Sequence, residues 1–258
     1  MSSPIHPGPD STTVLGKTVL VLRAFTIEDR GVSLSELGHR TGLAKGTLHR
    51  LCSDLVSTGL LERQDDRYRL GRLMFELGMR ASVERDLLEV ATPYLHELQA
   101  ALDQTVHLGV REGTEVVYVA KIVGHHQAKA PSRTGGRLGL HCTAVGKALL
   151  AHAPPEVVEA VIARGLERRT PRTLTMPGLL LAQLERVRKT GVAYEFEESR
   201  VGLVCVGAPV FGPHDEVVAA VSATGDINRF NPRLHAARVR TTAQNISATL
   251  GRPGPSSR

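Results

Sequence analysis

Two short amphipathic patterns lie near the N-terminus and are separated by the dipeptide Thr41-Gly42. The first covers residues 34–41, where Ser33 and Glu36 have the N-cap and N3 spacing of a capping box. The second has apolar residues at i, i+3, i+4, i+7 and i+8, namely Leu48, Leu51, Cys52, Leu55 and Val56. Its opposite face is polar and carries Lys45, Thr47, His49, Arg50 and Ser53. This order predicts a helix, a tight turn at the glycine, and a second helix with one face in solvent.

A basic hairpin pattern follows the two helices. Residues 60–71 predict strand, turn and strand, and Arg63, Arg67 and Arg69 lie within them. Residues 14–25 are apolar at helical spacing and predict a first helix packed beneath the pair. Two short helices around a glycine turn are common and do not by themselves indicate DNA binding. The hairpin directly after them favours a winged helix-turn-helix, whose second helix enters the major groove.

The spacing of apolar residues changes from helical to strand-like at Thr105. Beta-branched runs predict strands over residues 105–111, 116–123, 203–211 and 217–224. Helical patterns cover residues 87–102 (with Pro93 as a local irregularity), 144–152, 156–164, 178–190 and 232–250. Strands that pair as hairpins, with helices between them, predict an antiparallel sheet covered by helices and so an α+β fold.

These elements predict two domains. Residues 13–71 form the winged helix-turn-helix, and residues 72–85 form a connector helix. Residues 86–250 form a second domain that is long enough to bury its own core. The Pro- and Ser-containing ends, residues 1–12 and 251–258, are predicted to be disordered tails.

Bulk composition excludes several classes of protein. The 258 residues have a formal net charge of +6, but residues 1–80 have eleven Lys or Arg against nine Asp or Glu. The basic excess is therefore spread over the chain and is only a loose sign of nucleic-acid binding. There is no apolar run of the length that spans a membrane and no signal-peptide pattern, so no membrane partner is expected. Three widely separated cysteines indicate reduced thiols in a cytoplasmic protein.

The polar face of the second helix supplies the candidate DNA contacts. Arg50 is expected to contact a guanine edge or a phosphate, although a solvated helix cation is the alternative. Ser33, Lys45 and Thr47 suit phosphate contacts that set register, and His49 lies on the same face. On the hairpin, Arg67 and Arg69 are candidates for the DNA backbone or minor groove, with ordinary exposed arginines as the alternative.

The histidines and cysteines give little support to a metal site. His125-His126 and His141-Cys142 are adjacent pairs, without the i, i+4 spacing of a helical metal pair, and no CxxC motif occurs. His141 is expected to orient the loop before the helix at residue 144. No cofactor is expected.

The chain resembles the IclR family of bacterial transcriptional regulators over nearly everything from Val14 to Gly251. The motifs that carry the resemblance include GLAKGTLHRL from Gly42, YRLG from Tyr68, LHCTAVGKALLA from Leu140, RKTGVAY from Arg188, EESRVG from Glu197, VCVGAPV from Val204 and VAAVS from Val218. The resemblance implies an N-terminal winged helix and a C-terminal GAF-like effector domain. It also implies homodimers or homotetramers on palindromic operators, with small organic acids or aromatic metabolites as effectors.

Carried over onto this sequence, the resemblance implies an effector pocket lined by Ala144, Val145, Glu195, Leu203, Cys205, Ser222 and Thr224. This chain departs from the family pattern at Thr143-Ala144-Val145, where smaller side chains are common, at Gly207, where Ala is more usual, and at Glu195, where a shorter acid is frequent. A strand Cys is often simply buried in the sheet, which is the alternative for Cys205. The resemblance does not indicate whether the effector releases or promotes DNA binding.

Two other classes of function remain open from the residues alone. An enzyme would use Cys205 as nucleophile and His141 or Glu195 as base, but no nucleophile elbow, phosphate loop or dinucleotide fingerprint occurs. An architectural DNA-binding protein would have a purely structural second half. We therefore predict a regulator without enzyme activity.

Overall fold

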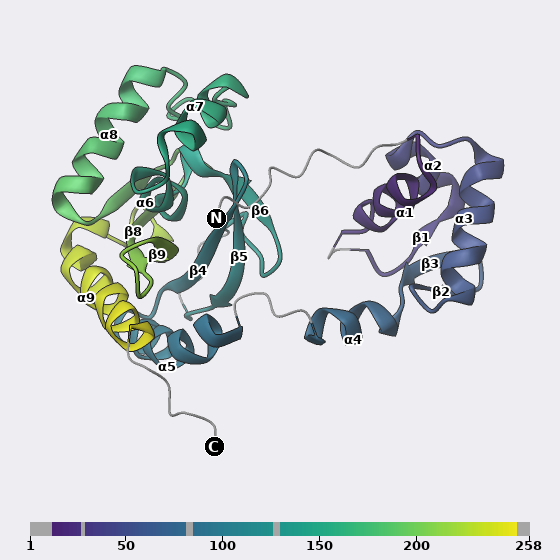
Figure 1. Ribbon diagram of the computed structural model, residues 1–258, viewed down its shortest axis with the longest axis horizontal. Helices are drawn as coiled ribbons and strands as arrows, with labels where there is room; N and C mark the ends of the chain where they lie inside the picture. Colours follow the sequence, from purple (N-terminus) through teal and green to yellow (C-terminus); the bar gives the residue numbers. More distant parts are fainter. Residues whose placement is uncertain (1–11, 27–28, 81–84, 126–129, 252–258) are drawn as a thin grey trace. The chain divides into compact units, whose positions relative to one another are not determined.

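The computed structural model describes residues 12–26, 29–80, 85–125 and 130–251. Most of the predicted tails, the end of the predicted connector and His126 lie outside these residues. The chain divides into two compact units, whose described parts are residues 12–80 and 85–251 (Figure 1).

The first unit is a small helical bundle edged by a three-stranded antiparallel sheet in the order β1-β3-β2. Its elements are α1 (Val14–Arg23), β1 (Val32–Ser33), α2 (Leu34–Thr41), α3 (Lys45–Ser57), β2 (Leu61–Gln64), β3 (Arg67–Leu70) and α4 (Arg72–Arg80). The predicted winged helix-turn-helix is confirmed. The sequence interpretation missed β1, which pairs with β3 and adds a third strand to the expected hairpin.

Local chemistry explains where the two central helices begin and end. Ser33 Oγ accepts a hydrogen bond from the N–H of Glu36 at 3.2 Å and caps α2. Gly42 ends that helix with φ 69°, a left-handed conformation that glycine adopts without strain. The apolar stripe of α3 then packs into one core with α1, α2 and the wing. The buried residues of this core are Val21, Val32, Leu37, Leu48, Leu51, Cys52, Leu55, Leu61 and Tyr68.

The second unit is a six-stranded antiparallel sheet in the order β6-β5-β4-β9-β8-β7. Its strands are β4 (Thr105–Glu112), β5 (Glu115–Ile122), β6 (Arg137–Gly139), β7 (Ala193–Phe196), β8 (Leu203–Phe211) and β9 (Val217–Asp226). Its helices are α5 (Arg85–Leu102), the short η1 (Leu140–Cys142), α6 (Ala144–Ala151), α7 (Pro155–Ala163), α8 (Pro177–Thr190) and α9 (Pro232–Leu250). The predicted α+β class is confirmed, whereas β6, β7 and η1 were not predicted.

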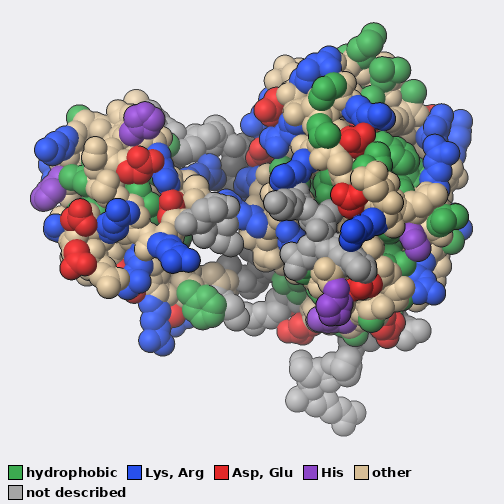
Figure 2. Space-filling view, turned by 180° about the vertical axis from the view of Figure 1, so that it is seen from behind, with side chains coloured by type: hydrophobic (Ala, Val, Ile, Leu, Met, Phe, Trp, Pro, Cys, Tyr) green, Lys and Arg blue, Asp and Glu red, His purple; other side chains and the backbone are tan. Residues whose placement is uncertain are grey.

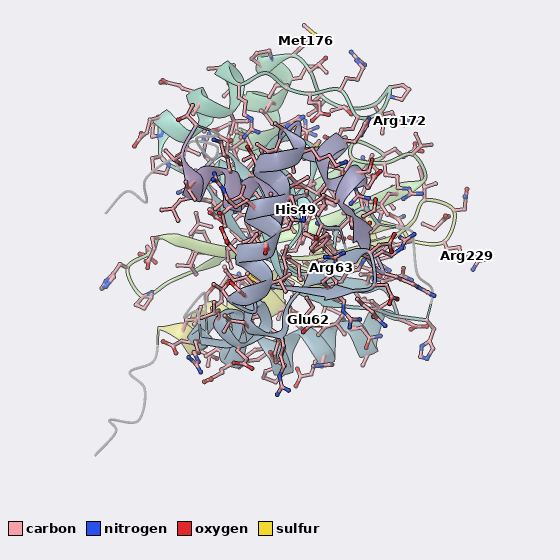
Figure 3. All side chains as sticks on the ribbon, turned by 90° about the vertical axis from the view of Figure 1, so that its right-hand side faces the viewer. His49, Glu62, Arg63, Arg172, Met176 and Arg229 are labelled. Atoms are coloured by element: carbon pink, nitrogen blue, oxygen red, sulfur yellow. The ribbon has the colours of Figure 1, made fainter. Side chains whose placement is uncertain are left out.

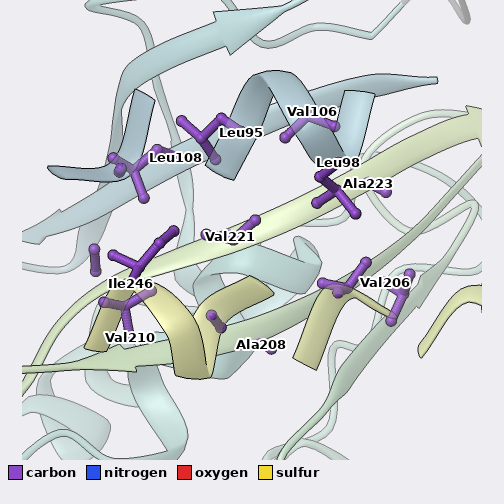
Figure 4. Close-up of a cluster of buried hydrophobic side chains, with 14 of the residues drawn as sticks. Leu95, Leu98, Val106, Leu108, Val206, Ala208, Val210, Val221, Ala223 and Ile246 are labelled. Atoms are coloured by element: carbon purple, nitrogen blue, oxygen red, sulfur yellow. The ribbon is translucent and has the colours of Figure 1, made fainter. Parts of the chain in front are cut away.

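Helices cover the two faces of this sheet differently. On one face, α5 and α9 pack on even-numbered residues of β4 and β8 and on odd-numbered residues of β9, such as Val106, Val206 and Val221 (Figure 4). On the other face, α6 lies against the sheet with α7 and α8 outside it. Because successive residues of a strand point to opposite faces, the neighbours of those core residues point toward α6. This alternation creates the polar site described below.

Two glycines in the sheet, Gly109 and Gly207, let α6 begin close to the strands. A Cβ atom at Gly207 would lie 3.0 Å from the carbonyl carbon of Ala144, and a Cβ at Gly109 would meet the Val145 side chain. Glycine at these two strand positions therefore lets the N-terminus of α6 approach the backbone of β8 and β4.

No helix among the described residues has the length and apolar character needed to span a membrane. The same residues contain no cluster of three His, Cys, Asp or Glu side chains arranged to hold a metal ion.

Candidate functional sites

The polar face of α3 is open to solvent in the first unit. Lys45, His49 and Arg50 are exposed, Thr47 is half-buried, and the apolar stripe between them is covered by the core. Arg40 and Arg69 form ion pairs with carboxylates of their own unit, whereas Lys45 and Arg50 form none with any described carboxylate. These two cations are therefore free to meet an external anion.

A groove of about 520 Å³ runs between the start of α2, the flank of α3 and the wing. It brings together Ser33, Lys45 and His49 of the predicted set, whereas Thr47 and Arg50 are not among its lining residues. Arg63 on β2 lines the groove as well, with its guanidinium 5.7 Å from the centre of the Tyr68 ring (Figure 3). The sequence pattern places Arg63 in the basic hairpin but does not indicate it as a site residue.

The two predicted wing arginines are already bonded within the unit. Arg67 donates from Nη1 to the carbonyl oxygen of Gly31 at 3.0 Å. Arg69 pairs with Glu62 at 3.2 Å, both side chains being about half exposed. An exposed pair of this kind contributes little and is easily exchanged for another partner. Figure 2 shows Lys and Arg side chains interspersed with Asp and Glu on its visible face, in agreement with a spread charge.

The second unit has a cavity between α6 and the sheet. All the residues predicted for the effector pocket line it: Ala144, Val145, Glu195, Leu203, Cys205, Ser222 and Thr224. The cavity is also lined by His107, Tyr118, Ala130, Pro131, Ser132, Leu138, Thr143 and Ser199, none of which was predicted as a site residue. Among its described lining residues there is no Lys or Arg.

His107 is the centre of a hydrogen-bonded chain on the cavity floor. Its Nε2 lies 2.7 Å from Ser132 Oγ, and its Nδ1 lies 3.4 Å from Thr224 Oγ1. Burial, assisted by the positive charge of Lys121, lowers the pKa of His107 to about 3, so the imidazole is neutral near pH 7. Thr224 gives its one hydrogen to Cys205 Sγ at 3.1 Å and must accept from Nδ1. Nε2 is then the acceptor for the Ser132 hydroxyl.

Glu195 lies deep in the cavity and is 1% exposed. Its Oε1 accepts hydrogen bonds from the Ser199 N–H at 2.9 Å and from the Ser199 hydroxyl. Burial raises the pKa of Glu195 above its ordinary value, although the bonds from Ser199 oppose this shift. In its ionised form the carboxylate disfavours an anion beside it, and in either form it can accept a hydrogen bond from a ligand hydroxyl or amine.

The thiol of Cys205 is protonated and weakly nucleophilic. Burial raises the pKa of Cys205 well above its ordinary value, with the neighbouring Glu195 carboxylate acting in the same direction. Of the two bases suggested for an enzyme, His141 does not reach this thiol. His141 is not among the residues lining the cavity, and its Nε2 lies 3.0 Å from the carbonyl oxygen of Glu167.

A buried ion pair holds α6 to the loop that closes one side of the cavity. Lys147 is fully buried and lies 2.6 Å from Glu198 Oε1 and 2.7 Å from Gln183 Oε1. At the start of α6, Thr143 Oγ1 accepts from the Gly146 N–H at 3.0 Å and caps the helix. The remaining N–H groups of this first turn have no partner within the helix.

The sequence contains independent evidence for the same two units. A family model described as IclR helix-turn-helix domain matches residues 14–65, and one described as bacterial transcriptional regulator IclR C-terminal matches residues 79–248. The chain belongs to the IclR family. Among curated relatives, the regulator KdgR of Escherichia coli is 34% identical over 250 residues, 94% of each chain. The repressor AllR of Salmonella typhi is 31% identical over 247 residues, 93% of this chain and 91% of its own.

A solved IclR homologue from Microbacterium hydrocarbonoxydans, complexed with 4-hydroxybenzoate, has the same fold. It is 30% identical, has a TM-score of 0.84, and the match covers 92% of this chain and 99% of that one. The IclR of Thermotoga maritima matches with a TM-score of 0.75 and 29% identity, over 92% of this chain and 98% of that one. This IclR-family protein is thus a DNA-binding transcriptional regulator, and the enzyme alternative is set aside.

Proposed function

We propose that this regulator controls metabolic genes in the cytoplasm, binds a palindromic operator as a homodimer or homotetramer, and responds to a small organic acid or aromatic metabolite. The observation that carries the proposal is the convergence of residues from α6, β7, β8 and β9 on one buried cavity. The cavity belongs to a unit separate from the DNA-binding one, as a sensor and its output should.

The proposed DNA contacts follow from exposure and free charge. Arg50 projects from the outer face of α3 and contacts a base edge or a phosphate. Lys45, Thr47, His49 and Ser33 bond to phosphates and fix the register of α3 in the major groove. The wing arginines Arg67 and Arg69 exchange their present partners for the DNA backbone beside the groove.

The proposed effector has an anionic end and a hydrogen-bond donor. Because no lysine or arginine is among the described residues lining the cavity, an anion is best stabilised by the free N–H groups and dipole at the start of α6. The Ser222 and Thr224 hydroxyls lie on β9 against this end of the cavity. A hydroxyl or amine of the ligand then points toward Glu195, which accepts it.

Exposed apolar side chains support self-association through the first unit. Leu15 on α1 is 78% exposed and Phe75 on α4 is 68% exposed, and Val14, Val19 and Leu77 on the same helices are also exposed. Several exposed apolar side chains on one helix are a common feature of interfaces between proteins. A dimer formed there presents two copies of α3 to two half-sites of a palindrome.

The proposed response is a shift between two arrangements of the dimer. The effector binds one arrangement more tightly, and that arrangement spaces the two recognition helices differently. A tenfold change in operator affinity requires only about 1.4 kcal/mol of differential binding.

Two experiments test this function. Selection from random-sequence duplexes should enrich a palindrome, and Arg50→Ala should lose the enrichment. A thermal-shift screen of small carboxylic acids and phenols should yield a ligand that raises the melting temperature, since a ligand at 100 times its Kd adds about 2.7 kcal/mol. Enrichment of a palindrome without any stabilising ligand would instead favour the architectural alternative.

A further inference from the structure

The effector cavity is too small for any organic ligand in this structure. The empty space of the cavity, including the solvent at its mouth, is about 260 Å³, but only about 10 Å³ of it can hold the centre of a water molecule. That is room for about one water, whereas ligand pockets enclose roughly 300–1,000 Å³. One wall of the cavity must therefore move before a ligand enters.

Most of the walls are firmly bonded. The floor consists of β4, β9 and β8, which pair continuously along their central residues. The roof is α6, whose residues are all buried. The side formed by residues 197–199 is fixed by the Lys147–Glu198 ion pair. In addition, the Thr170 hydroxyl donates to the carbonyl oxygen of Glu197, and the Thr173 hydroxyl donates to that of Glu198.

The segment Ala130–Ser132, which we call the strap, is different. It belongs to no helix or strand, and it lines the cavity with Ala130 packed on Ala144, Leu203 and Cys205. Two hydrogen bonds hold Ser132, which is 6% exposed. Its hydroxyl bonds to His107 Nε2 at 2.7 Å, and its carbonyl oxygen accepts from Lys121 Nζ at 2.7 Å.

His107 is suited to hold the strap because it cannot turn freely. Its ring packs edge-on against Tyr118 with centroids 5.2 Å apart, and Nδ1 is used by the hydroxyls of β9. The acceptor Nε2 is thus aimed at the strap and is satisfied by Ser132 alone among the described residues.

We infer that the strap is the wall that opens for the ligand, and that Ser132, bonded to His107 and Lys121, is the positioning residue that keeps it closed. This inference rests on the proposed function of the cavity as the effector site. Loss of either bond raises the fraction of time for which Cys205, beneath Ala130, is accessible from solvent.

Alkylation of the cysteines by iodoacetamide, resolved by peptide mass spectrometry, tests the strap without a known ligand. Ser132→Ala in the full-length protein should raise the labelling rate of Cys205 about fivefold, as expected from loss of one hydrogen bond of about 1 kcal/mol. Adding Lys121→Met should raise it to about 25-fold if the two bonds act independently. Ser132→Thr, which keeps the hydroxyl, should return the rate toward that of the unchanged protein.

Cys142 provides the internal control because it is buried in the same unit but does not line the cavity. Its labelling rate should stay constant in Ser132→Ala. As a matched variant, Ser247→Ala removes a hydroxyl that bonds to Phe211 N and Ala243 O on the opposite face of the sheet. That change should leave the ratio of Cys205 to Cys142 labelling unaltered.

Parallel acceleration of both thiols, or no acceleration of Cys205 in Ser132→Ala, would overturn the inference, because access would then require unfolding or another route. The outcome is distinguishable from failure of the proposed function. A strap that opens as expected, in a protein that no small acid or phenol stabilises, would leave the strap standing and remove the effector role.

Discussion

The two units expose their functional residues in opposite ways. In the first unit the candidate contacts project from an already formed helix, and Lys45 and Arg50 have no carboxylate partner among the described residues. In the second unit the candidate contacts face inward around a cavity that holds about one water. The proposed DNA-binding surface is thus preformed, whereas the proposed effector site has to open before it can bind a ligand. Substitutions in the first unit should therefore change affinity, and those in the second should change stability and access.

The largest expected effect concerns the buried ion pair of the second unit. Lys147→Met should leave the Glu198 carboxylate without its cation and destabilise this unit by about 3–5 kcal/mol. Denaturant unfolding at fixed protein concentration, followed by hydrogen exchange in peptides of each unit, measures this. Peptides of the first unit should keep their protection, because its core is separate.

The double variant Lys147→Met with Glu198→Leu is the matched control, since it removes both charges. It should recover most of the lost stability. Equal losses in the single and the double variant would show that packing, and not the unpaired charge, accounts for the effect.

The next effect belongs to the open surface of the first unit. Arg50→Ala should weaken operator binding by about 1–3 kcal/mol, or about 5- to 150-fold, if the guanidinium reads a base. Arg23→Ala, which removes another exposed cation from the end of α1, should change the affinity far less. Titration of both variants with the selected operator at one salt concentration measures the difference. Equal losses would reduce Arg50 to a general electrostatic role.

A smaller effect concerns pH: the stability of the second unit should fall as the pH falls, because of His107. The folded-state pKa of His107, about 3, lies below its unfolded value near 6.5, so the unfolded chain binds the extra proton first as the pH falls. The second unit should lose about 1.4 kcal/mol between pH 7.5 and pH 5.5 from this group. Urea unfolding of the protein and of His107→Gln at both pH values isolates this contribution. The first unit, whose His39 and His49 are exposed, lacks such a buried histidine among its described residues.

The smallest expected effect separates the stability of α3 from its fit to DNA. Gly46 is exposed in the first turn of α3, and a Cβ there would meet no atom within 4 Å. Gly46→Ala should stabilise the first unit by up to about 1 kcal/mol. It should nevertheless weaken operator binding if the backbone needs close approach. Gly78→Ala, at an equally open position of α4, should stabilise without weakening. Unchanged operator affinity in both variants would show that Gly46 has no role at the DNA.

The elements of the first unit could be predicted because their causes are local. Ser33, Gly42 and the apolar stripe of α3 act within a few residues of one another, and the pattern alone shows them. The strands β1, β6 and β7 have only two to four residues, which is too short for a recognisable period. They exist because longer strands offer them an edge for pairing.

The proposed effector site could be predicted only in part, because it depends on which strands become neighbours. Glu195 and Cys205 meet because β7 pairs with β8, which no spacing in the sequence indicates. Their assignment came from the family resemblance. His107 shares the cavity because it lies opposite Ser222 in the register of β4 and β9. Ser132 shares it because its hydroxyl bonds to His107. Neither position has a local signal.

The most direct test of the account measures operator affinity with and without a ligand identified by thermal shift. We predict that a saturating ligand changes the affinity of the unchanged protein at least tenfold. Glu195→Gln should alter the ligand concentration required but not the affinity of the ligand-free protein for DNA. Identical operator affinity at zero and saturating ligand would contradict the account.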